Sequence, residues 1–233
     1  MSLFVVGTDT GVGKTVVTAG LTGWLRRDGI DAVAVKPCQT GYPPDDDAGE
    51  VQRVTGSEEA AVCLRRLEPA LAPAVAAREA DAGLSYEDIL EGCRERIEAS
   101  ERALVEGIGG LRVPLADGRD VVDLVADLGL PALVVARSGL GTLNHTALTV
   151  EALRRRSVPV LGVVLNEYEG ATTAERTNPD VIERENDLAV ATLPPVDVAD
   201  PDAVVDAVAE HLPDDFRGKE QGGTSPGGGS RGV

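Results

Sequence analysis

The stretch Gly7–Thr15, "GTDTGVGKT", constrains the fold of this chain more than any other. It follows the apolar run 3–6 and precedes a segment whose apolar residues recur at helical spacing. A strand, a glycine-rich loop and a helix in this order form the setting in which a loop binds nucleotide phosphates. The common pattern has four residues between its first glycine and the Gly-Lys pair, whereas five separate Gly7 from Gly13. We therefore predict a variant phosphate-binding loop; the alternative is an ordinary tight turn.

Short apolar runs alternate with amphipathic segments along the rest of the chain, and their continuous hydrophobicity fits strands buried on both faces of a parallel sheet. We expect strands at residues 3–6, 32–36, 103–106, 132–136, 160–165 and 189–193. We expect helices near residues 14–28, 48–55, 85–101, 120–128, 144–156, 179–186 and 202–211. This alternation predicts a doubly wound α/β fold of the P-loop NTPase kind, with helices flanking a mainly parallel sheet. Ligands of such folds bind beyond the carboxyl ends of the strands.

Domain organisation and location follow from the ends of the chain and from its cysteines. Residues 1–215 are predicted to form one domain, and the Gly/Ser-rich residues 216–233 a disordered tail. The start "MSLFVVGTDTG" does not resemble a signal peptide, and no apolar run approaches the ~20 residues that span a bilayer. The three cysteines are widely spaced and suggest reduced thiols. We expect a cytoplasmic protein.

The charge of the chain excludes some partners and draws attention to two residues. A formal net charge of -17 argues against binding to nucleic acid or to an anionic membrane surface. A chain this acidic resembles the proteins of salt-loving organisms, whose surfaces are highly acidic. Lysine occurs only at Lys14, Lys36 and Lys219, and arginine fills the other basic positions. Because Lys219 lies in the tail, the domain retains lysine at two places, which suggests sites that need a compact ammonium group.

Charged residues also end two predicted strands. Lys36 ends the second strand, and a buried lysine there is costly unless it faces a ligand anion; the alternative is a lysine that reaches water at the rim of the sheet. Three aspartates, Asp45–Asp47, follow, and a solvated acidic loop would explain them equally well. Glu106 ends the third strand in "LVEGIGG", where P-loop enzymes carry a carboxylate that holds Mg²⁺. The alternative is a carboxylate that caps a nearby N–H group.

Six segments, taken in order, resemble the dethiobiotin synthetase family over residues 3 to about 212. They are "GTDTGVGKT", "KPCQTG", "DDDA", "VEGIGG", "SGLGTLNHTALT" and "VVLN". The resemblance implies ATP and Mg²⁺ as cofactors and 7,8-diaminononanoate and CO₂ as small-molecule substrates. The diamine and CO₂ form a carbamate, ATP phosphorylates it to a carbamic-phosphoric anhydride, and the second amine closes a cyclic urea. The implied products are dethiobiotin, ADP and phosphate.

The resemblance also implies roles for individual residues. Lys14, Lys36 and Thr10 would act on the transferring phosphate, and Thr40 would contact the substrate. Thr15, Asp47 and Glu106 would hold magnesium, with Asp47 chosen because the family pairs this aspartate with a following alanine. Nucleotide contacts would come from Gly11, Val12, Gly13, Lys14, Thr15, Val16, Asp47, Glu106, Gly107, Ile108, Gly109, Asn166, Glu167, Pro194, Pro195 and Val196. Asn166 would read the adenine edge, and Pro194–Val196 would border the base on its other side.

The segment "SGLGTLNHTALT" is expected to open a helix at about Asn144. Backbone N–H groups of Gly141, Thr142 and Asn144 could bind the substrate carboxylate, and the resemblance implies that they come from the partner subunit of a homodimer. The alternative is a helix that Asn144 caps and that binds nothing. His145 is interpreted as structural. Two departures from the family leave gaps, since Gly11 replaces a glutamate found in some relatives and "EYEGATTAERTNPD" has no clear counterpart.

Two other functions deserve comparison with this one. A switch ATPase of the ParA/MinD type carries a signature lysine at the loop position that Asp9 occupies here, so Asp9 argues against that alternative. An ATP-dependent amidotransferase would need an additional glutaminase domain with a nucleophilic cysteine and a histidine. The chain has only His145 and His211 and is too short for that domain.

Overall fold

In the computed structural model, which describes residues 1–217, seven parallel strands form the central sheet in the order β11-β10-β9-β1-β6-β2-β4. Their bounds are β1 Leu3–Gly7, β2 Ala32–Lys36, β4 Ala61–Cys63, β6 Arg102–Gly110, β9 Ala132–Arg137, β10 Val160–Asn166 and β11 Val190–Thr192. Each strand pairs in parallel with its neighbours. The carboxyl ends of all these strands therefore meet at one edge of the sheet, and the loops that follow them lie together.

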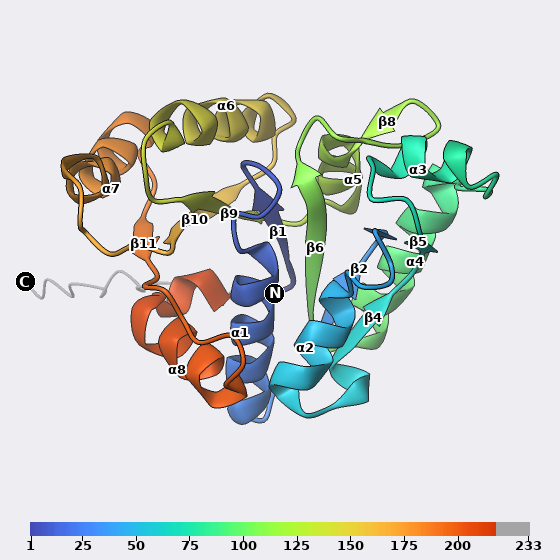
Figure 1. Cartoon of the computed structure of the whole chain (residues 1–233), viewed down its shortest axis with the longest axis horizontal. Helices are drawn as coiled ribbons and strands as arrows, with labels where there is room; N and C mark the ends of the chain where they lie inside the picture. The colour runs from blue at the N-terminus through green and yellow to red at the C-terminus, as the bar shows by residue number, and fades with distance from the viewer. Residues whose placement is uncertain (218–233) are drawn as a thin grey trace, which may run out of the picture.

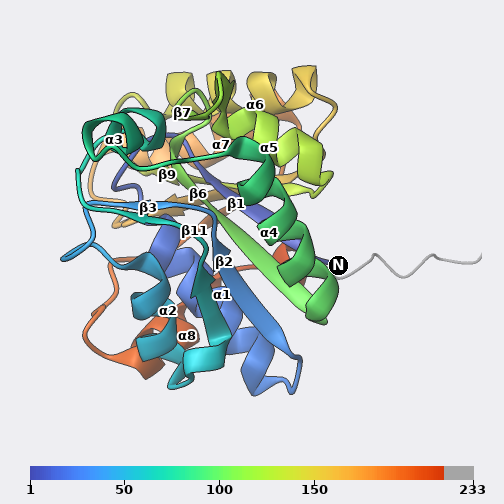
Figure 2. The same ribbon diagram turned by 90° about the vertical axis from the view of Figure 1, so that its right-hand side faces the viewer.

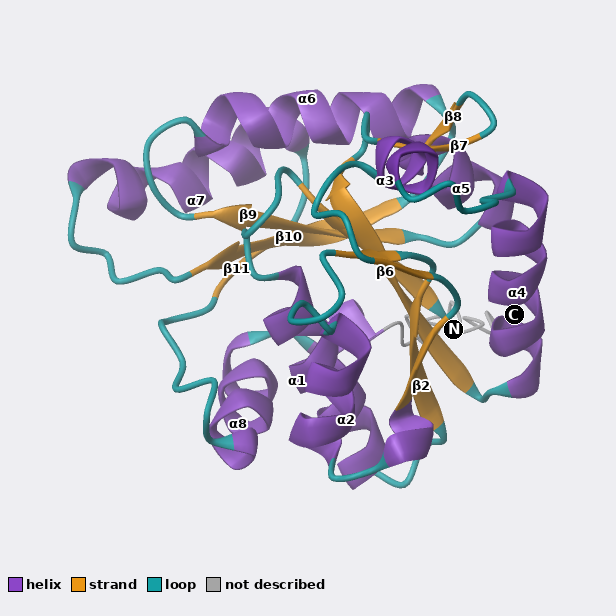
Figure 3. Cartoon of the chain, turned by 45° about the vertical axis from the view of Figure 1, so that its right-hand side comes forward, coloured by secondary structure: helices purple, strands orange, loops and turns teal. Residues whose placement is uncertain are grey.

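Helices cover both faces of this sheet (Figures 1 and 2). On one face lie α1 Lys14–Arg27, α2 Asp47–Thr55 and α8 Pro201–His211, and on the other α4 Tyr86–Ala99, α5 Val121–Leu128, α6 Thr142–Arg155 and α7 Thr173–Asn186. Figure 3 shows the strands as the layer between α6 and α7 on one side and α1, α2 and α8 on the other. The remaining elements are short: α3 Pro73–Glu79, the parallel pair β3 Gln39–Thr40 and β5 Arg66–Leu67, the antiparallel pair β7 Pro114–Ala116 and β8 Arg119–Asp120, and the 3₁₀ turns Glu58–Ala60 and Asp214–Arg217.

The first strand shows how the sequence creates the two cores. Leu3 and Val5 pack with the apolar side of α1, whereas Phe4 and Val6 pack with the helices of the opposite layer. Successive side chains of a strand point to opposite faces, and all four are at most 1% exposed. A continuous apolar run is therefore what a strand between two helical layers requires.

The expected doubly wound fold is confirmed, with corrections at several element ends. The strand β4 and the helix α3 were not predicted, because three and seven residues are too few for a reliable pattern. Helix α7 begins at Thr173, six residues before the predicted start at 179. Its first turn carries a capping box, since Glu175 N donates to Thr172 Oγ1 (3.1 Å) and Thr172 N donates to Glu175 Oε2 (3.0 Å). The helix continues through Pro179 instead of starting at it.

The domain extends two residues beyond the predicted boundary at 215. Phe216 is 1% exposed and packs against Gly162 of β10, where a Cβ atom would lie 2.2 Å from its ring. The Arg217 guanidinium lies 4.0 Å from the centre of the Trp24 ring and pairs with Asp28 and Asp214. Burial of an aromatic ring and of a paired cation places these residues in the fold. The rest of the predicted tail, residues 218–233 with Lys219, lies outside the described residues.

Two further observations concern the sequence predictions of location. Cys38, Cys63 and Cys93 are free thiols, and burial raises the pKa of Cys38 to about 12 and that of Cys93 to about 12. Within residues 1–217, no helix combines the length and the apolar character needed to cross a membrane.

Candidate functional site

Buried charges gather at the carboxyl ends of three neighbouring strands. Lys14 follows β1 and its loop, and Lys36 ends β2. Glu106 lies inside β6, which continues to Gly110 instead of ending at Glu106 as predicted. The exposed fractions of Lys14, Lys36 and Glu106 are only 7%, 5% and 2%. The register places Glu106 beside Val5, while Val35 pairs with Val105, so that Lys36 and Glu106 lie next to each other. Charged side chains are seldom buried unless they are paired or face a ligand.

The phosphate loop is held in shape by two glycines. Gly13 precedes α1 with φ 95, in the left-handed region that favours glycine. A Cβ atom at this position would also lie 2.0 Å from the Asn166 amide nitrogen, so any larger residue would displace one of the two. At the other end of the loop, a Cβ atom on Gly7 would lie 2.8 Å from Lys14 Nζ. The lysine side chain therefore folds back over the strand end, where its Nζ donates to Asp9 O (3.1 Å).

Lys36 is the centre of a buried network. Its Nζ donates to Glu106 Oε1 (2.9 Å) and to Gly107 O (3.1 Å), and it pairs with the Asp47 carboxylate. Thr15 Oγ1 donates to the same Glu106 oxygen (2.9 Å). The structure thus brings together the two lysines, the two carboxylates and the hydroxyl for which the sequence predicted roles in phosphate and metal binding.

The pKa values of this network reflect the balance between burial and pairing. Burial lowers the pKa of Lys36, but Glu106 and Asp47 outweigh it and keep that pKa above its usual value. Burial raises the pKa of Glu106, and Lys36 offsets this only in part. The pKa of Lys14 falls to about 8, first because of burial and then because of the nearby Lys36 charge. Lys14 is therefore a cation with little compensation, suited to an incoming anion.

The residues near Thr15 fit Mg²⁺ in chemistry. Asp47 and Glu106 offer carboxylate oxygens and Thr15 offers a hydroxyl, and hard cations of this kind prefer oxygen ligands. Among residues 1–217, no group of three or more His, Cys, Asp or Glu side chains could hold a metal ion by itself. Mg²⁺ commonly uses one or two carboxylates together with the phosphates of a substrate.

Asp9 organises the tip of the loop. Its carboxylate accepts from Thr10 N (2.7 Å), and its backbone carbonyl accepts from Lys14. Arg137, the last residue of β9, donates to Thr10 O (3.1 Å) and lies 3.9 Å from the Asp9 carboxylate. The Thr10 hydroxyl lies beside Gly109, where a Cβ atom would approach it to 3.2 Å. Sequence reasoning overlooked Arg137, although its place at a strand end was a signal.

Gln39 connects the predicted substrate residue with the predicted metal ligand. Its side-chain amide donates to Thr40 O (2.9 Å), and its side-chain oxygen accepts from Asp47 N (3.1 Å). Asp47 begins α2, and Asp46 caps that helix by accepting from Gly49 N (3.1 Å). The three aspartates are thus not an unstructured acidic loop. Gln39 is buried and lies in the "KPCQTG" segment, but sequence reasoning assigned it no role.

The residues predicted to contact the base lie along the ends of β10 and β11. Asn166 ends β10 beside Arg137 and is 7% exposed. Glu167 follows with φ 54, and the next residue, Tyr168, donates its N–H to Leu193 O (2.9 Å). This bond brings the turn after β10 next to Pro194 and Pro195. Val196 packs against the same core as Val16 of the phosphate-loop helix, so the predicted base residues border one side of that loop.

The start of α6 differs from the sequence prediction. The helix begins at Thr142, two residues before Asn144, and Gly141 is its N-cap with φ 93. Asn144 therefore lies inside the first turn, and the alternative in which it caps the helix is wrong. A hollow between this turn and the phosphate loop is lined by Thr8, Asp9, Val12, Arg137, Leu140, Thr142 and His145. Of the residues that carry the predicted substrate amides, Thr142 lines this hollow, together with Thr8, Asp9 and Val12 of the loop.

Comparison with known proteins places this geometry in a family. A family model described as an AAA domain matches residues 1–203. The ATP-dependent dethiobiotin synthetase BioD of Haloferax mediterranei is 62% identical over 209 residues, which cover 90% of each chain. The enzyme of the same name from Mycobacterium marinum is 44% identical over 197 residues, which cover 83% of this chain and 84% of that one.

Solved structures resemble the chain at the level of the fold. The cell division ATPase MinD of Pyrococcus furiosus superposes with a TM-score of 0.55 at 17% identity, covering 90% of this chain and 97% of that chain. The signal recognition particle receptor FtsY of Elizabethkingia anophelis gives 0.56 at 14% identity, covering 89% and 64%. These likenesses establish a P-loop NTPase fold. The identity over nearly the whole length of curated relatives goes further, and the chain belongs to the dethiobiotin synthetase family.

Proposed function

We propose that this protein closes a cyclic urea, using ATP and Mg²⁺ to convert 7,8-diaminononanoate and CO₂ into dethiobiotin, ADP and phosphate. The observation that carries the proposal is a pair of buried lysines, Lys14 at the start of α1 and Lys36 at the end of β2, beside two carboxylates and the phosphate loop. The near-complete match to relatives named for this synthesis supports the same reaction.

The reaction brings two anions together, a carbamate and the terminal phosphate of ATP. Preorganised cations lower that barrier because they cost no reorganisation when charge develops. Lys14 would hold the outer phosphates, and Lys36 would lie between the phosphate and the carbamate. Mg²⁺, when bound, neutralises phosphate charge as a Lewis acid, and Thr15, Asp47 and Glu106 would hold it. The Thr10 hydroxyl, at the loop tip beside Gly109, would contact the transferring group.

The atoms balance without further reagents. A carbamate oxygen attacks the terminal phosphorus, and the bond from that phosphorus to the bridging oxygen of ADP breaks. The second amine then attacks the carbamate carbon and gives up a proton to the solvent. The bond from that carbon to the oxygen shared with phosphorus breaks, and phosphate leaves with that oxygen. The chain contributes position and charge to these steps, as in other phosphoryl transfers.

The substrate-binding site would be completed by a second copy of the chain. Gly141, Thr142 and Asn144 carry the N–H groups at the start of a 14-residue helix that suit a carboxylate. Three leucines around them are exposed, Leu140 by 98%, Leu148 by 58% and Leu143 by 39%. Leu140 lies just before α6, and Leu143 and Leu148 lie on it. Exposed leucines that gather in one region are typical of an interface. We propose a homodimer that packs through α6 and shares its substrate site, with Thr40 contacting the diamine.

The free thiols and the net charge of -17 support a cytoplasmic enzyme that binds neither nucleic acid nor membranes. The direct test of function is to incubate purified protein with ATP, Mg²⁺, bicarbonate and the diamine, and to measure dethiobiotin and phosphate by mass spectrometry. We expect both in equal amounts. ATP turnover that is independent of the diamine and yields no cyclic urea would contradict the proposal and favour a switch ATPase.

A further inference from the structure

One buried amide holds the loop that precedes α6. Asn178 lies in the second turn of α7 and is 4% exposed. Its Nδ2 donates to Ser138 O (2.8 Å) and to Gly139 O (3.1 Å), the two residues that follow β9. Both amide protons are therefore used on the backbone of one loop, and that loop leads directly into the proposed substrate helix.

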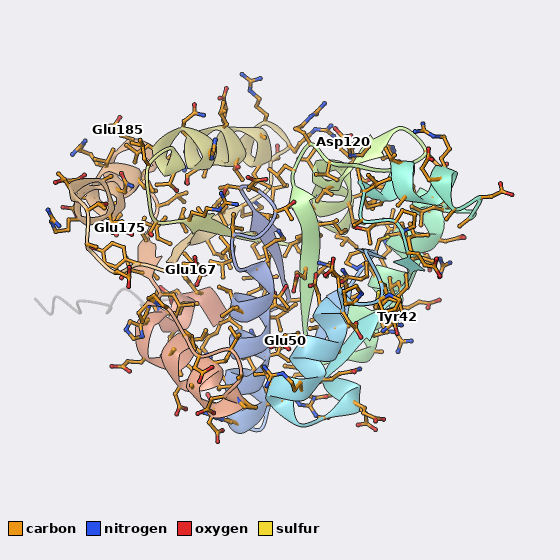
Figure 4. All side chains as sticks on the ribbon, viewed as in Figure 1. Tyr42, Glu50, Asp120, Glu167, Glu175 and Glu185 are labelled. Carbon is orange, nitrogen blue, oxygen red and sulfur yellow. The ribbon has the colours of Figure 1, made fainter. Side chains whose placement is uncertain are left out.

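The same loop has a second attachment to α7. Ser138 Oγ lies 3.0 Å from Glu175 Oε1 and 3.1 Å from Glu167 O, and can donate its proton to either. The other oxygen of Glu175 closes the capping box at the start of α7. Figure 4 shows Glu167 and Glu175 on the α7 side of the molecule. The turn that follows Asn166 and the loop that precedes α6 are thus joined through one helix start.

Apolar packing does little to hold this loop. Leu140 is 98% exposed, and the space where Gly139 would carry a Cβ atom is open to a distance of 4 Å. Gly141 adopts φ 93, and Gly139, two residues before it, adds further freedom to the backbone. Besides the bond from Thr142 N to Gly139 O (3.4 Å), the bonds from Asn178 and Ser138 are therefore the contacts that fix its path and so the direction of the first N–H groups of α6.

We propose that Asn178 is a positioning residue for substrate binding: its amide orients residues 138–141 so that the N–H groups at the start of α6 can bind a carboxylate. This inference rests on the proposed function. An aspartate of the same shape cannot replace it, because a carboxylate has no N–H group and would face two carbonyl oxygens.

The chain offers a matched control on the same helix. Asn186 is also buried, at 8% exposed, but its Nδ2 donates only to Ile182 O (3.0 Å) within α7. Asn178→Ala and Asn186→Ala therefore each remove a buried amide from α7, and only the first releases the loop. Asn178→Asp is a second variant that preserves side-chain volume should Asn178→Ala fold poorly.

For the full-length enzyme we expect Asn178→Ala to raise the KM for the diamine about tenfold, the effect of losing two hydrogen bonds. The Kd for ADP should stay within about twofold of the wild-type value. Asn178→Ala and Asn186→Ala should lower the melting temperature to a similar extent. Asn186→Ala should leave the KM for the diamine unchanged. An unchanged KM in both Asn178 variants, or an equal rise in Asn186→Ala, would overturn the proposal.

Amide hydrogen exchange separates this inference from the proposed function. We expect the amides of residues 139–144 to exchange faster in Asn178→Ala and Asn178→Asp and to exchange normally in Asn186→Ala. Equal exchange in all variants would overturn the positioning role even if the wild-type enzyme makes dethiobiotin. If the wild-type enzyme makes none, the proposed function fails, and exchange still decides whether Asn178 holds the loop.

Discussion

The two sides of the proposed active site are built from different interactions. Along β2 and β6, buried Lys36 and its carboxylate partners compensate one another, and Lys36 reaches Glu106 at 2.9 Å. At the start of α6 and α7, neutral amides and a serine hold the backbone, while Leu140 and Leu148 are exposed. In Figure 4, Glu167 and Glu175 mark the second side, and Tyr42 lies on the far side, beyond β2.

This difference indicates that the two sides have different roles, phosphoryl transfer on one and substrate binding on the other. A phosphoryl transfer between anions needs fixed positive charge that solvent does not screen, and burial provides it. Binding a flexible diamino acid needs an aligned set of donors and, if the site is shared, a surface that a second subunit can cover. We call Lys14, Lys36, Asp47 and Glu106 the charged side of the site, and the starts of α6 and α7 the α6–α7 side. Changes to the charged side should reduce the rate of ring closure, and changes to the α6–α7 side should weaken substrate binding or dimer assembly.

The largest effect is expected for Lys36→Gln. Removing the central cation should lower kcat for dethiobiotin formation by about 10²–10³-fold, the usual consequence of deleting a group that stabilises transition-state charge. The Kd for ADP should change only a few-fold, because Lys36 is not part of the phosphate loop. Lys14→Gln is the matched control, and we expect it to lose nucleotide binding instead.

Stability must be measured beside this variant. Leaving buried carboxylates without their partner costs about 3–5 kcal/mol in comparable cases, so thermal unfolding should show a clear loss. A folded Lys36→Gln protein that no longer binds ADP would break the assignment of Lys36 to the substrate side of the phosphate.

On the other side of the site, Leu148→Asp should prevent association through α6. A carboxylate placed in an apolar interface must be desolvated without a partner, so we expect a monomer in sedimentation experiments. Dethiobiotin formation should fall at least about tenfold, while the Kd for ADP stays close to the wild-type value. Full activity in a monomeric variant would contradict the shared site.

The pH dependence of ATP affinity tests the compensation of charge around Lys14. Its pKa of about 8 lies below the usual value of 10.5, so the free protein loses this proton above pH 8. Phosphates favour the ammonium form, and binding above pH 8 must therefore take up a proton. Affinity should fall by up to about tenfold per pH unit there, and calorimetry in buffers of different ionisation enthalpy should detect the uptake.

The same shift has a defined sign for stability. Because the folded pKa lies below the unfolded one, the unfolded chain binds more protons between pH 8 and 10.5, and the free energy of unfolding contributed by Lys14 rises with pH in that window. Constant ATP affinity from pH 7 to 9 would show that Lys14 does not titrate near 8.

The smallest effect is expected for Arg137→Ala. Arg137 is exposed, and its carboxylate partner Asp9 lies 3.9 Å away, so the pair contributes less than about 1 kcal/mol. ATP affinity should fall less than about fivefold, measured against Arg112→Ala as a remote exposed control. A larger loss would mean that Arg137 contacts the nucleotide itself.

The charged side was readable from the sequence because its residues end or follow apolar runs. Lys36 and Glu106 end apolar runs, and parallel strands bring such positions to one edge of the sheet, while the pairing of β2 with β6 that makes them neighbours is seen only in the structure. Asp47 was harder to choose among three aspartates. The hydrogen bond from its backbone N–H group to the Gln39 side chain fixes Asp47 at the start of α2. A single bond of this kind produces no periodic pattern in the sequence.

The α6–α7 side was less predictable for the same physical reason. An asparagine that bonds a distant carbonyl looks like any polar residue of an exposed helix, so Asn178 could not be recognised. The start of α7 did carry a signal, the Thr-x-x-Glu box at Thr172, but Pro179 suggested a later start. Phe216 and Arg217 were assigned to the tail because their partners, Gly162 and Trp24, are distant in sequence.

Oxygen transfer tests most directly whether the charged side joins a carbamate to phosphate. Rapid mixing of the enzyme, ATP, Mg²⁺ and the diamine with CO₂ labelled with oxygen-18 should place a single labelled oxygen in the released phosphate. The label is expected because a carbamate oxygen attacks phosphorus and leaves with it. Phosphate that carries only solvent oxygen, formed alongside ADP, would contradict that chemistry.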